Sequence, residues 1–470
     1  MASRILLIST NRCTTPDPVF PLGLAHLSSA LRQAGHDSRW FDCQSASAPL
    51  AEVLRAYRPD GIGISLRNID DVLIRKRETY SDGLPQMCRD IRRAHPGVII
   101  LGGSGFSIFP RQLLELSGAD FGIQGEGEAS LPALVSALGQ GGQYHSIPGL
   151  VHRNGGEIVV NPPSRSGPEI LLTPVDRPAH LTAHYLASGG MLNLQTQRGC
   201  RHGCGYCTYP LIEGRANRRR PPEAVAEEMA QLRAAGAKYV CIVDSIFNSS
   251  PQHVVETCEA LIRRRLAMPW GCFLRPQGLT AELVGLMARA GLAHIEFGSD
   301  SFCDAVLAAY GKQLTFEDIL QSSELARKAR IDVCHFLIAG GPAETRATLE
   351  EGFANSQRLK DAVILAVVGM RVYPGTDLLK RALSEGRIKA DTDLLAPTYY
   401  LAPGLTAEAV LGQLEEFARR APNWIVGDPD PAYRGLVARL RQRGVAGPLW
   451  SYFAMLQRLW PRGVAREGNP

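Results

Sequence analysis

Three cysteines, Cys200, Cys204 and Cys207, lie close together in the segment QTQRGCRHGCGYCTYP. Thiolates at such spacing bind a metal ion, form a redox pair or hold an iron–sulfur cluster. A structural zinc ion prefers four ligands, and the nearest further candidate, His202, lies poorly placed inside the same loop. A Cys-x-x-Cys redox pair would leave Cys200 unexplained. Three thiolates on a four-iron cluster would leave one iron open to a substrate or cofactor.

The spacing Cys200-x3-Cys204-x2-Cys207, with an aromatic residue before the last cysteine, resembles the signature of the radical S-adenosylmethionine (SAM) superfamily. The resemblance implies a [4Fe-4S] cluster on these cysteines, with SAM chelating the open iron. One electron from the cluster would cleave SAM to methionine and a 5'-deoxyadenosyl radical. The residues that the resemblance assigns to SAM binding are Tyr206, Asp244, Ser245, Glu296, Asp300 and Gly341.

Several of these assignments have a structural alternative. Asp244 and Ser245 end the strand predicted over YVCIVD and would serve equally well as the N-cap of the next helix. Gly341 lies in IAGGPAET, which would lie beside the adenine or form an ordinary strand-to-helix turn. Asp300 occupies a position where the family more commonly has Glu.

The cysteine loop follows the first strand of a series of strand–helix repeats that begins at residue 191. The predicted strands are MLNLQT, YVCIVD, WGCFLR, HIEFGSD, DVCHFLIAG and AVILAVVGMRVYP. Repeats of this kind predict a partial or full TIM-like βα barrel, in which chemistry takes place at the carboxyl ends of the strands.

The N-terminal part of the chain alternates short apolar strands with helices, which predicts a doubly wound, Rossmann-like parallel sheet. Ligands of such sheets bind beyond the carboxyl ends of the strands. Those ends are the segments STNRCTTPD, SLRNIDD and GGSGFS.

PDPVFPLGLAHLSSALRQAGH and GGSGFSIFP, with DFGIQGEGE, resemble the cobalamin-binding domain that precedes many radical SAM cores. The alternative is that the glycines only form a turn. Many cobalamin proteins carry Asp-x-His-x-x-Gly, but Pro18 and Phe20 occupy the Asp and His positions, so cobalamin is expected without a protein His ligand. The residues that this resemblance assigns to cobalamin are Ser65, Gly102, Gly103, Ser104 and Gly105.

The chain is therefore predicted to contain four segments. They are a cobalamin-binding-like domain over 1–135, a linker over 136–190, a radical SAM barrel over 191–395 and a helical C-terminal region over 396–470. The linker is expected to hold one hairpin with its turn at Asn154-Gly155.

Composition narrows the class of protein. A net charge of +5 spread over 470 residues argues against nucleic acid as a partner. No apolar run is long enough for a transmembrane helix. The chain has 11 cysteines and no recognisable signal peptide, which predicts reduced thiols and a cytoplasmic location.

Together the two resemblances imply a cobalamin-dependent radical SAM C-methyltransferase with methylcobalamin as methyl donor. One alternative is a radical SAM enzyme that catalyses rearrangement, cyclisation or oxidation without methyl transfer. Another is a non-catalytic iron–sulfur binding or regulatory protein. The expected partners are a small-molecule or lipid-like substrate and an external electron donor such as flavodoxin or ferredoxin.

Overall fold

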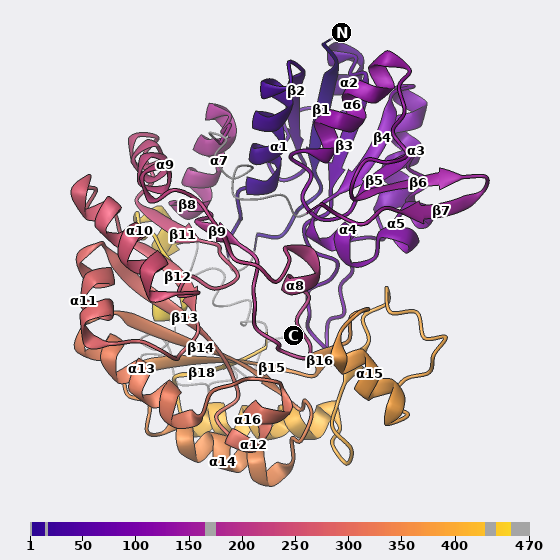
Figure 1. Ribbon diagram of the computed structural model, residues 1–470. Helices are drawn as coiled ribbons and strands as arrows, with labels where there is room; N and C mark the ends of the chain where they lie inside the picture. The colour runs from indigo at the N-terminus through magenta and orange to yellow at the C-terminus, as the bar shows by residue number, and fades with distance from the viewer. Residues whose placement is uncertain (1, 15–16, 165–174, 428–438, 453–470) are drawn as a thin grey trace, which may run out of the picture.

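The computed structural model describes residues 2–14, 17–164, 175–427 and 439–452. It contains two α/β units, an N-terminal one and a larger one that begins near residue 191, and they face each other as Figure 1 shows. The predicted fold class is confirmed, because each unit is built on a parallel sheet covered by helices.

The first sheet has the strand order β2-β1-β3-β4-β5-β6-β7. Its parallel strands are β1 (Arg4–Ser9), β2 (Asp37–Asp42), β3 (Gly61–Ser65), β4 (Val98–Gly102) and β5 (Phe121–Ile123). The helices of this unit are α1 (Leu22–Gln33), α2 (Leu50–Tyr57), α3 (Leu84–Ala94), α4 (Ser104–Ile108), α5 (Pro110–Ser117) and α6 (Ser130–Gln140). Two separate apolar clusters cover the two faces of the sheet, which explains why the inner strands β1 and β4 are almost continuously apolar.

The predicted linker differs from the structure. The expected hairpin is present as β6 (Leu150–Asn154) and β7 (Glu157–Val160), but β6 pairs with β5 and so extends the first sheet. Helix α7 (Ala179–Gly189) follows before the second unit. Much of 136–190 is therefore part of the packed fold. Glycine and proline content signalled a turn correctly but carried no information about the strand that the hairpin joins.

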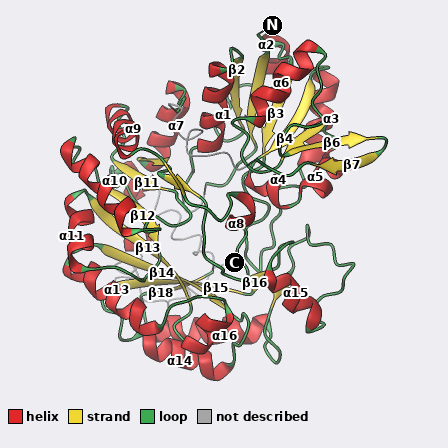
Figure 2. Cartoon of the chain, in the orientation of Figure 1, coloured by secondary structure: helices red, strands yellow, loops and turns green. Residues whose placement is uncertain are grey.

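The second sheet is entirely parallel, with the order β18-β15-β14-β13-β12-β11-β8. Its strands are β8 (Met191–Leu194), β11 (Tyr239–Ile242), β12 (Trp270–Leu274), β13 (Leu292–Asp300), β14 (Asp332–Ala339), β15 (Ala362–Val368) and β18 (Trp424–Val426). The sheet is curved, and helices cover its outer face in Figure 2. Within the described part of the chain it ends at β8 and β18, so the barrel is partial.

The remaining elements surround this sheet. The helices are α8 (Tyr209–Ile212), α9 (Pro222–Ala234), α10 (Pro251–Arg263), α11 (Ala281–Arg289), α12 (Asp304–Ala309), α13 (Phe316–Lys328), α14 (Arg346–Ser356), α15 (Asp377–Ser384) and α16 (Ala407–Arg420). Two small ribbons pair β9 (Gln197–Arg198) with β10 (Arg218–Arg219) and β16 (Met370–Arg371) with β17 (Tyr399–Tyr400).

The C-terminal region is not purely helical as predicted. It contains α16, but β18 pairs with β15 and becomes an edge strand of the barrel sheet. Trp424 and Ile425 are both 2% exposed there. A strand of three residues is too short for hydrophobic periodicity to distinguish it from the end of a helix.

Buried ion pairs join the two units. Asp70, in the loop after β3, pairs with Arg371 of β16 at 2.7 Å, with side chains 0% and 4% exposed. Asp17 pairs with Arg441 at 2.6 Å near the other end of the chain. A buried ion pair contributes little net stability, but a misplaced partner is costly. These pairs therefore hold one relative orientation of the units.

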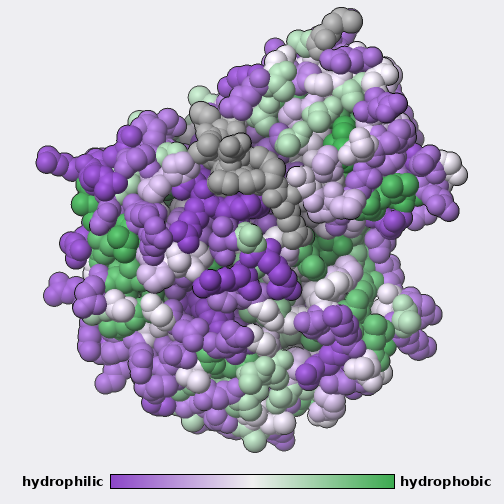
Figure 3. Space-filling model, in the orientation of Figure 1, coloured by the Kyte–Doolittle hydropathy of each residue, from purple (hydrophilic) through white to green (hydrophobic). Residues whose placement is uncertain are grey.

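The surface gives no sign of a membrane span. Hydrophilic residues predominate on the face seen in Figure 3. Across the described ranges, no helix combines the length and apolarity needed to cross a bilayer.

Candidate functional site

The cysteine loop is held firmly on its N-terminal side. Gly199 has φ +95°, and a Cβ there would lie 2.0 Å from the carbonyl oxygen of Ala216, so only glycine fits. Its N–H donates to Glu213 at 3.1 Å. The N–H of Cys200 donates to the carbonyl of Gly214 at 2.9 Å. The first cysteine is thus fixed by backbone contacts with the segment that leads into β10.

The other end of the loop rests on the barrel. The N–H of Gly205 donates to the carbonyl of Tyr310 at 3.0 Å, and its carbonyl accepts from Leu378 at 2.8 Å. Gly311, with φ +75°, lets the chain pass close to Gly203, whose carbonyl oxygen would lie 2.7 Å from an added Cβ. Backbone contacts therefore hold the cysteine loop near both of its ends.

The three thiols suit a cluster better than a single ion. All 11 cysteines of the chain are unpaired. Within the described residues, no group of three His, Cys, Asp or Glu side chains converges as the ligands of one metal ion do. A four-iron cluster spans a larger volume than one ion and does not require that tight convergence.

Charges around the loop also fit an anionic group. Burial raises the pKa of the Cys204 thiol and raises that of Cys207 to about 12, so an electrophile as strong as iron is needed to displace their protons. The cations of Lys312 and Arg275 oppose this effect at Cys204. They would offset the negative charge of a thiolate-ligated cluster.

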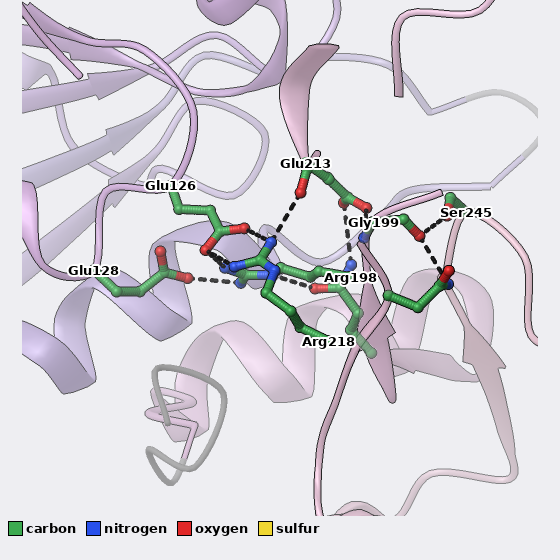
Figure 4. A network of polar contacts seen from close by, with 9 residues as sticks. Glu126, Glu128, Arg198, Gly199, Glu213, Arg218 and Ser245 are labelled. Carbon is green, nitrogen blue, oxygen red and sulfur yellow. Dashed lines mark hydrogen bonds and ion pairs between the residues drawn. The ribbon is translucent and has the colours of Figure 1, made fainter. Parts of the chain in front are cut away.

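Carboxylates from the first unit hold the strand that precedes Cys200, as Figure 4 shows. Glu126 and Glu128 follow the carboxyl end of β5. Glu128 pairs with Arg198 at 2.6 Å, and Glu126 forms an ion pair with Arg218. All four side chains are at most 10% exposed. The edge of the sheet at which a ligand would bind therefore contacts the strand leading into the cysteine loop.

Three of the residues predicted to bind SAM gather beside the loop. Tyr206 donates its hydroxyl hydrogen to Asp300, which also pairs with Lys312 at 2.5 Å. Asp300 has φ +64° and follows an irregularity in the pairing of β13 with β14. Gly341 donates its N–H to the hydroxyl of Tyr310 at 3.1 Å, and a Cβ at that glycine would meet the Tyr310 ring. Their contact with SAM stays a prediction.

Asp244 and Ser245 form hydrogen bonds with the residues that lead into the cysteine loop. Asp244 is 2% exposed and accepts hydrogen bonds from the backbone N–H and the hydroxyl of Thr196. Burial raises its pKa to about 7. Ser245 donates to the carbonyl of Gly199 at 3.1 Å. The alternative that these two residues cap the next helix is wrong, because Ser250 is the N-cap of α10.

Glu296 does not join this group. It precedes Asp300 on β13, and four residues of a strand span about 13 Å, so its backbone lies far deeper in the barrel. Its carboxyl group accepts a hydrogen bond from the indole of Trp450 at 2.9 Å. The two acidic residues of β13 that the resemblance assigns to SAM thus occupy different levels of the barrel.

The residues assigned to cobalamin lie together at the carboxyl ends of β3 and β4. Gly103 has φ +98°, and a Cβ there would lie 2.4 Å from the carbonyl of Leu66, so the turn itself requires glycine. Gly105 makes a similar close approach, with 3.0 Å between an added Cβ and the same carbonyl. Ser104 donates to the carbonyl of Arg67 at 2.9 Å. The remaining two, Ser65 and Gly102, are the last residues of the two strands.

Unpaired polar atoms at the same edge fit an amide-rich ligand such as a corrinoid. Within the part of the chain that the structure describes, the side-chain nitrogen of Asn11, just after β1, is buried without a hydrogen-bond partner, as is one carboxylate oxygen of Asp42 at the end of β2. Buried polar atoms of this kind are uncommon unless a ligand or water satisfies them. Cobalamin binding by the five assigned residues nevertheless stays a prediction.

Phe20, at the position of a cobalt-ligating His, faces the protein core. It is 2% exposed and packs against Trp40 and Tyr185, and the guanidinium of Arg177 lies 4.8 Å from its ring centroid. This position supplies neither an imidazole nor a side chain at the ligand-binding edge.

The sequence did not reveal the charged residues that surround the loop. Lys312 and Arg275 lie in segments without a motif, and their relation to Cys204 depends on the barrel fold. The QGEGE stretch was recognised only as part of a resemblance, whereas the structure shows its two glutamates paired with arginines on either side of the cysteine loop.

Comparison with known proteins agrees with this geometry. Residues 194–353 match the family model of the radical SAM superfamily, and residues 9–135 match that of the B12 binding domain. A tryptophan 2-C-methyltransferase from Streptomyces laurentii is 25% identical, and the match covers 80% of this chain and 74% of that protein. A hopanoid C-3 methylase from Methylococcus capsulatus is 26% identical, with 78% and 71% covered.

A solved structure shares the whole fold. The radical SAM methyltransferase TsrM from Kitasatospora setae, with cobalamin and a [4Fe-4S] cluster bound, superposes with a TM-score of 0.86. The match covers 98% of both chains at 23% sequence identity.

Proposed function

The chain belongs to the radical SAM superfamily and carries a B12 binding domain ahead of its radical SAM core, and we propose that it is a cobalamin-dependent C-methyltransferase. The observation that carries the proposal is the pairing of Glu126 and Glu128 with the arginines on either side of the cysteine loop. Through these pairs the ligand-binding edge of the first sheet lies against the strand that leads into the cysteine loop. Methyl transfer needs both cofactors within reach of one carbon.

When bound, the cluster would supply one electron to SAM, and cobalamin would carry the methyl group. The residues of the chain would hold and orient the cluster, SAM and cobalamin. Cys200, Cys204 and Cys207 would ligate the cluster, and Lys312 offsets its charge. Tyr206 and Asp300 would hold SAM. Fixed positions of this kind convert a collision of separate molecules into a reaction within one complex.

The relatives support this function and suggest acceptors. One named relative methylates tryptophan and another a hopanoid, so both a small aromatic molecule and a lipid are reasonable acceptors to test. L-tryptophan is the first choice, because a solved relative is described with tryptophan as its substrate.

The test is an anaerobic assay of the enzyme loaded with iron, sulfide and cobalamin, supplied with a reductant and SAM carrying a deuterated methyl group. The expected result is a deuterated methyl group on an acceptor together with S-adenosylhomocysteine. Cys207→Ala should abolish the product, whereas Cys258→Ala, a buried cysteine of α10, should retain it. Formation of 5'-deoxyadenosine without methyl transfer, in protein that binds no corrinoid, would contradict the proposal.

A second candidate is a radical reaction without methyl transfer. Relatives of similar architecture include an anaerobic magnesium-protoporphyrin IX monomethyl ester cyclase from Cereibacter sphaeroides, which is 26% identical and of which this chain covers 55%. In the same assay, an unmethylated, rearranged or cyclised product with 5'-deoxyadenosine would favour this candidate.

The proposal includes an external one-electron donor such as flavodoxin or ferredoxin and a cytoplasmic location. Unpaired cysteines throughout the chain suit a reducing compartment. Reduction by purified flavodoxin, followed as cleavage of SAM, tests the donor.

A further inference from the structure

The cysteine loop reaches the surface of the protein beside the start of α15. Asp377, the first residue of that helix, is 72% exposed, and a Cβ added at Gly205 would lie 3.8 Å from its Cβ. Gly203 is exposed as well, and no atom lies within 4 Å of its added Cβ. On this side the loop itself forms the surface of the part of the chain that the structure describes. Cys204 and Cys207, which lie on either side of Gly205 in the sequence, are therefore close to this surface.

Exposed cations gather around this part of the loop. Arg201 and Arg215 are both exposed, and the residues that precede them are joined by a backbone hydrogen bond of 2.9 Å. Lys380 is 77% exposed and pairs with Asp377 at 2.7 Å. This ion pair lowers the pKa of Asp377, and the charge of Arg215 acts in the same direction. Three exposed cations thus surround one exposed carboxylate, and the surface has a net positive charge.

An apolar side chain lies within the same surface. Leu211 is 42% exposed and belongs to α8, which starts two residues after the last cysteine of the loop. A Cβ added at Gly375, two residues before α15, would lie 3.1 Å from Cδ1 of this leucine. A single exposed leucine is ordinary on a protein surface. An exposed leucine surrounded by cations has the composition of a docking site, which is apolar at its centre and charged at its rim.

The spread of these side chains favours a protein over a small anion as the occupant. They come from three segments, which are the cysteine loop, α8 with the turn after it, and α15. A small anion is bound by donors that converge on one point, whereas a protein interface extends over many side chains. In the described structure, none of the three cations belongs to the buried ion pairs that join the two units. They can therefore be changed without disturbing those pairs.

We propose that the α8 surface, formed by Arg201, Leu211, Arg215 and Lys380, docks an acidic one-electron carrier of the flavodoxin class. The role of that carrier as electron donor rests on the function proposed above. Opposite charges on two proteins speed their association and select the orientation in which they meet. On this surface, that orientation would bring the flavin near the cysteine loop. The carrier would be oxidised by one electron and the cluster reduced by one, with no atom transferred.

The competing explanation is that these cations serve only to offset the charge of the cluster. Their removal would then shift the reduction potential and leave the affinity for flavodoxin unchanged. The docking proposal predicts the reverse. Solvent screens exposed charges from a group inside the loop, whereas a partner at the surface lies in direct contact with them.

The test is equilibrium binding of purified, oxidised flavodoxin to the full-length enzyme loaded with cluster and cobalamin, at low and at high salt. The surface variant is Arg215→Glu with Lys380→Glu. The matched control is Arg327→Glu with Lys328→Glu, which changes the total charge equally at exposed residues of α13. These residues end α13 and precede the start of β14, so they lie at the opposite end of the barrel from the cysteine loop.

Wild type should bind flavodoxin, and its affinity should fall as the salt concentration rises, because salt screens the attraction between exposed charges. The surface variant should bind at least about tenfold more weakly at low salt and lose most of its salt dependence. The control should bind as the wild type does. Leu211→Ala should weaken binding at both salt concentrations alike, because burial of an apolar side chain does not depend on charge.

The rate of cluster reduction gives a second readout. Reduction by reduced flavodoxin should slow about tenfold in the surface variant at low salt. Reduction by reduced methyl viologen, a small cation, should be no slower than in the wild type. Redox titration should give the same potential for both proteins.

Equal affinity of the surface variant and the wild type for flavodoxin would overturn the inference. So would an equal loss in the control variant, or failure of the wild type to bind at low salt. Binding and reduction are measured without SAM or acceptor, so charge-dependent docking without methyl transfer would contradict the proposed function and leave the α8 surface standing. Methyl transfer with a chemical reductant, but no binding of flavodoxin, would contradict only the α8 surface.

Discussion

Arg198, two residues before the first cysteine of the loop, forms a buried ion pair with Glu128 of the B12 binding domain at 2.6 Å. The two side chains are 8% and 7% exposed. A residue of one domain thereby sets the position of a strand in the other, and the cysteine loop begins where that strand ends. The position of the cysteine loop therefore depends on both domains.

Glu128→Gln should therefore lower stability and loosen the loop. Among the described residues, the substitution leaves the buried Arg198 with one longer ion pair, to Glu126 at 3.7 Å, and a hydrogen bond to Gln195 at 2.9 Å. A poorly compensated buried charge costs about 3 kcal/mol. Urea denaturation measures the loss, and the rate of Cys200 alkylation in iron-free protein measures the loosening. Glu223→Gln breaks an ion pair whose partners are 57% and 59% exposed, and should cost less than about 1 kcal/mol. Equal effects of the two variants would contradict the role of Glu128.

Gly199→Ala should prevent normal cluster assembly. The added Cβ would lie 2.0 Å from a backbone carbonyl, and φ +95° is strained for alanine. Iron and sulfide content after anaerobic reconstitution should fall severalfold. Gly203→Ala is the matched control in the same loop, because no atom lies within 4 Å of its added Cβ. Full iron content in Gly199→Ala would show that the loop has another conformation.

Lys312→Gln should make the cluster harder to reduce. Lys312 lies 2.5 Å from Asp300, and its charge acts on the Cys204 thiol. Removing a buried cation beside a cluster disfavours the extra electron, so the reduction potential should become more negative. Redox titration followed by electron paramagnetic resonance measures this shift. Lys380→Gln, at a lysine 77% exposed near the loop, should leave the potential unchanged.

The stability that Glu296 and Asp244 contribute should fall as the pH rises from 5 to 8, in opposition to buried histidines such as His253 and His335, whose pKa burial lowers. Burial raises the native pKa of Glu296 and of Asp244 to about 7, above their unfolded values of 4.5 and 3.8. The native state therefore binds more protons than the unfolded state within this window, and it loses that advantage as the pH passes through the native pKa. Thermal melting of the wild type and of Glu296→Gln, which cannot titrate at this position, isolates the contribution of Glu296. Relative to the wild type, the variant should be more stable at pH 8 than at pH 5, and a difference that does not change with pH would refute the assignment to Glu296.

The sequence predicted the architecture well where strands were long enough to be recognised. All six strands expected after residue 191 are present, and the loop of Cys200 follows the first of them. The missed strand β18 is three residues long, and the hairpin of β6 and β7 was found without its partner. Pairing between distant segments is decided by tertiary packing, which local periodicity does not record.

The site was predicted less completely. Tyr206 and Asp300, both assigned to SAM by the resemblance, are hydrogen-bonded to each other, but Glu296 lies deeper on the same strand as Asp300. Residues that alternate on one face look equivalent in sequence although they occupy different layers of a barrel. The pairing of Lys312 with Asp300 has no local signature, because it depends on a turn that returns the chain to the strand end.

The ion pair between Asp17 and Arg441 joins residues 424 positions apart. Contacts between such distant residues depend on the folding of the segments between them, so we expect this one to form after both sheets exist. Before this contact forms, the carboxylate of Asp17 lacks its ion-pair partner Arg441. A chain that ends before residue 441 would still contain every strand of both sheets but would lack the cation of Asp17. Loss of C-terminal residues would therefore leave a buried carboxylate uncompensated in the N-terminal domain.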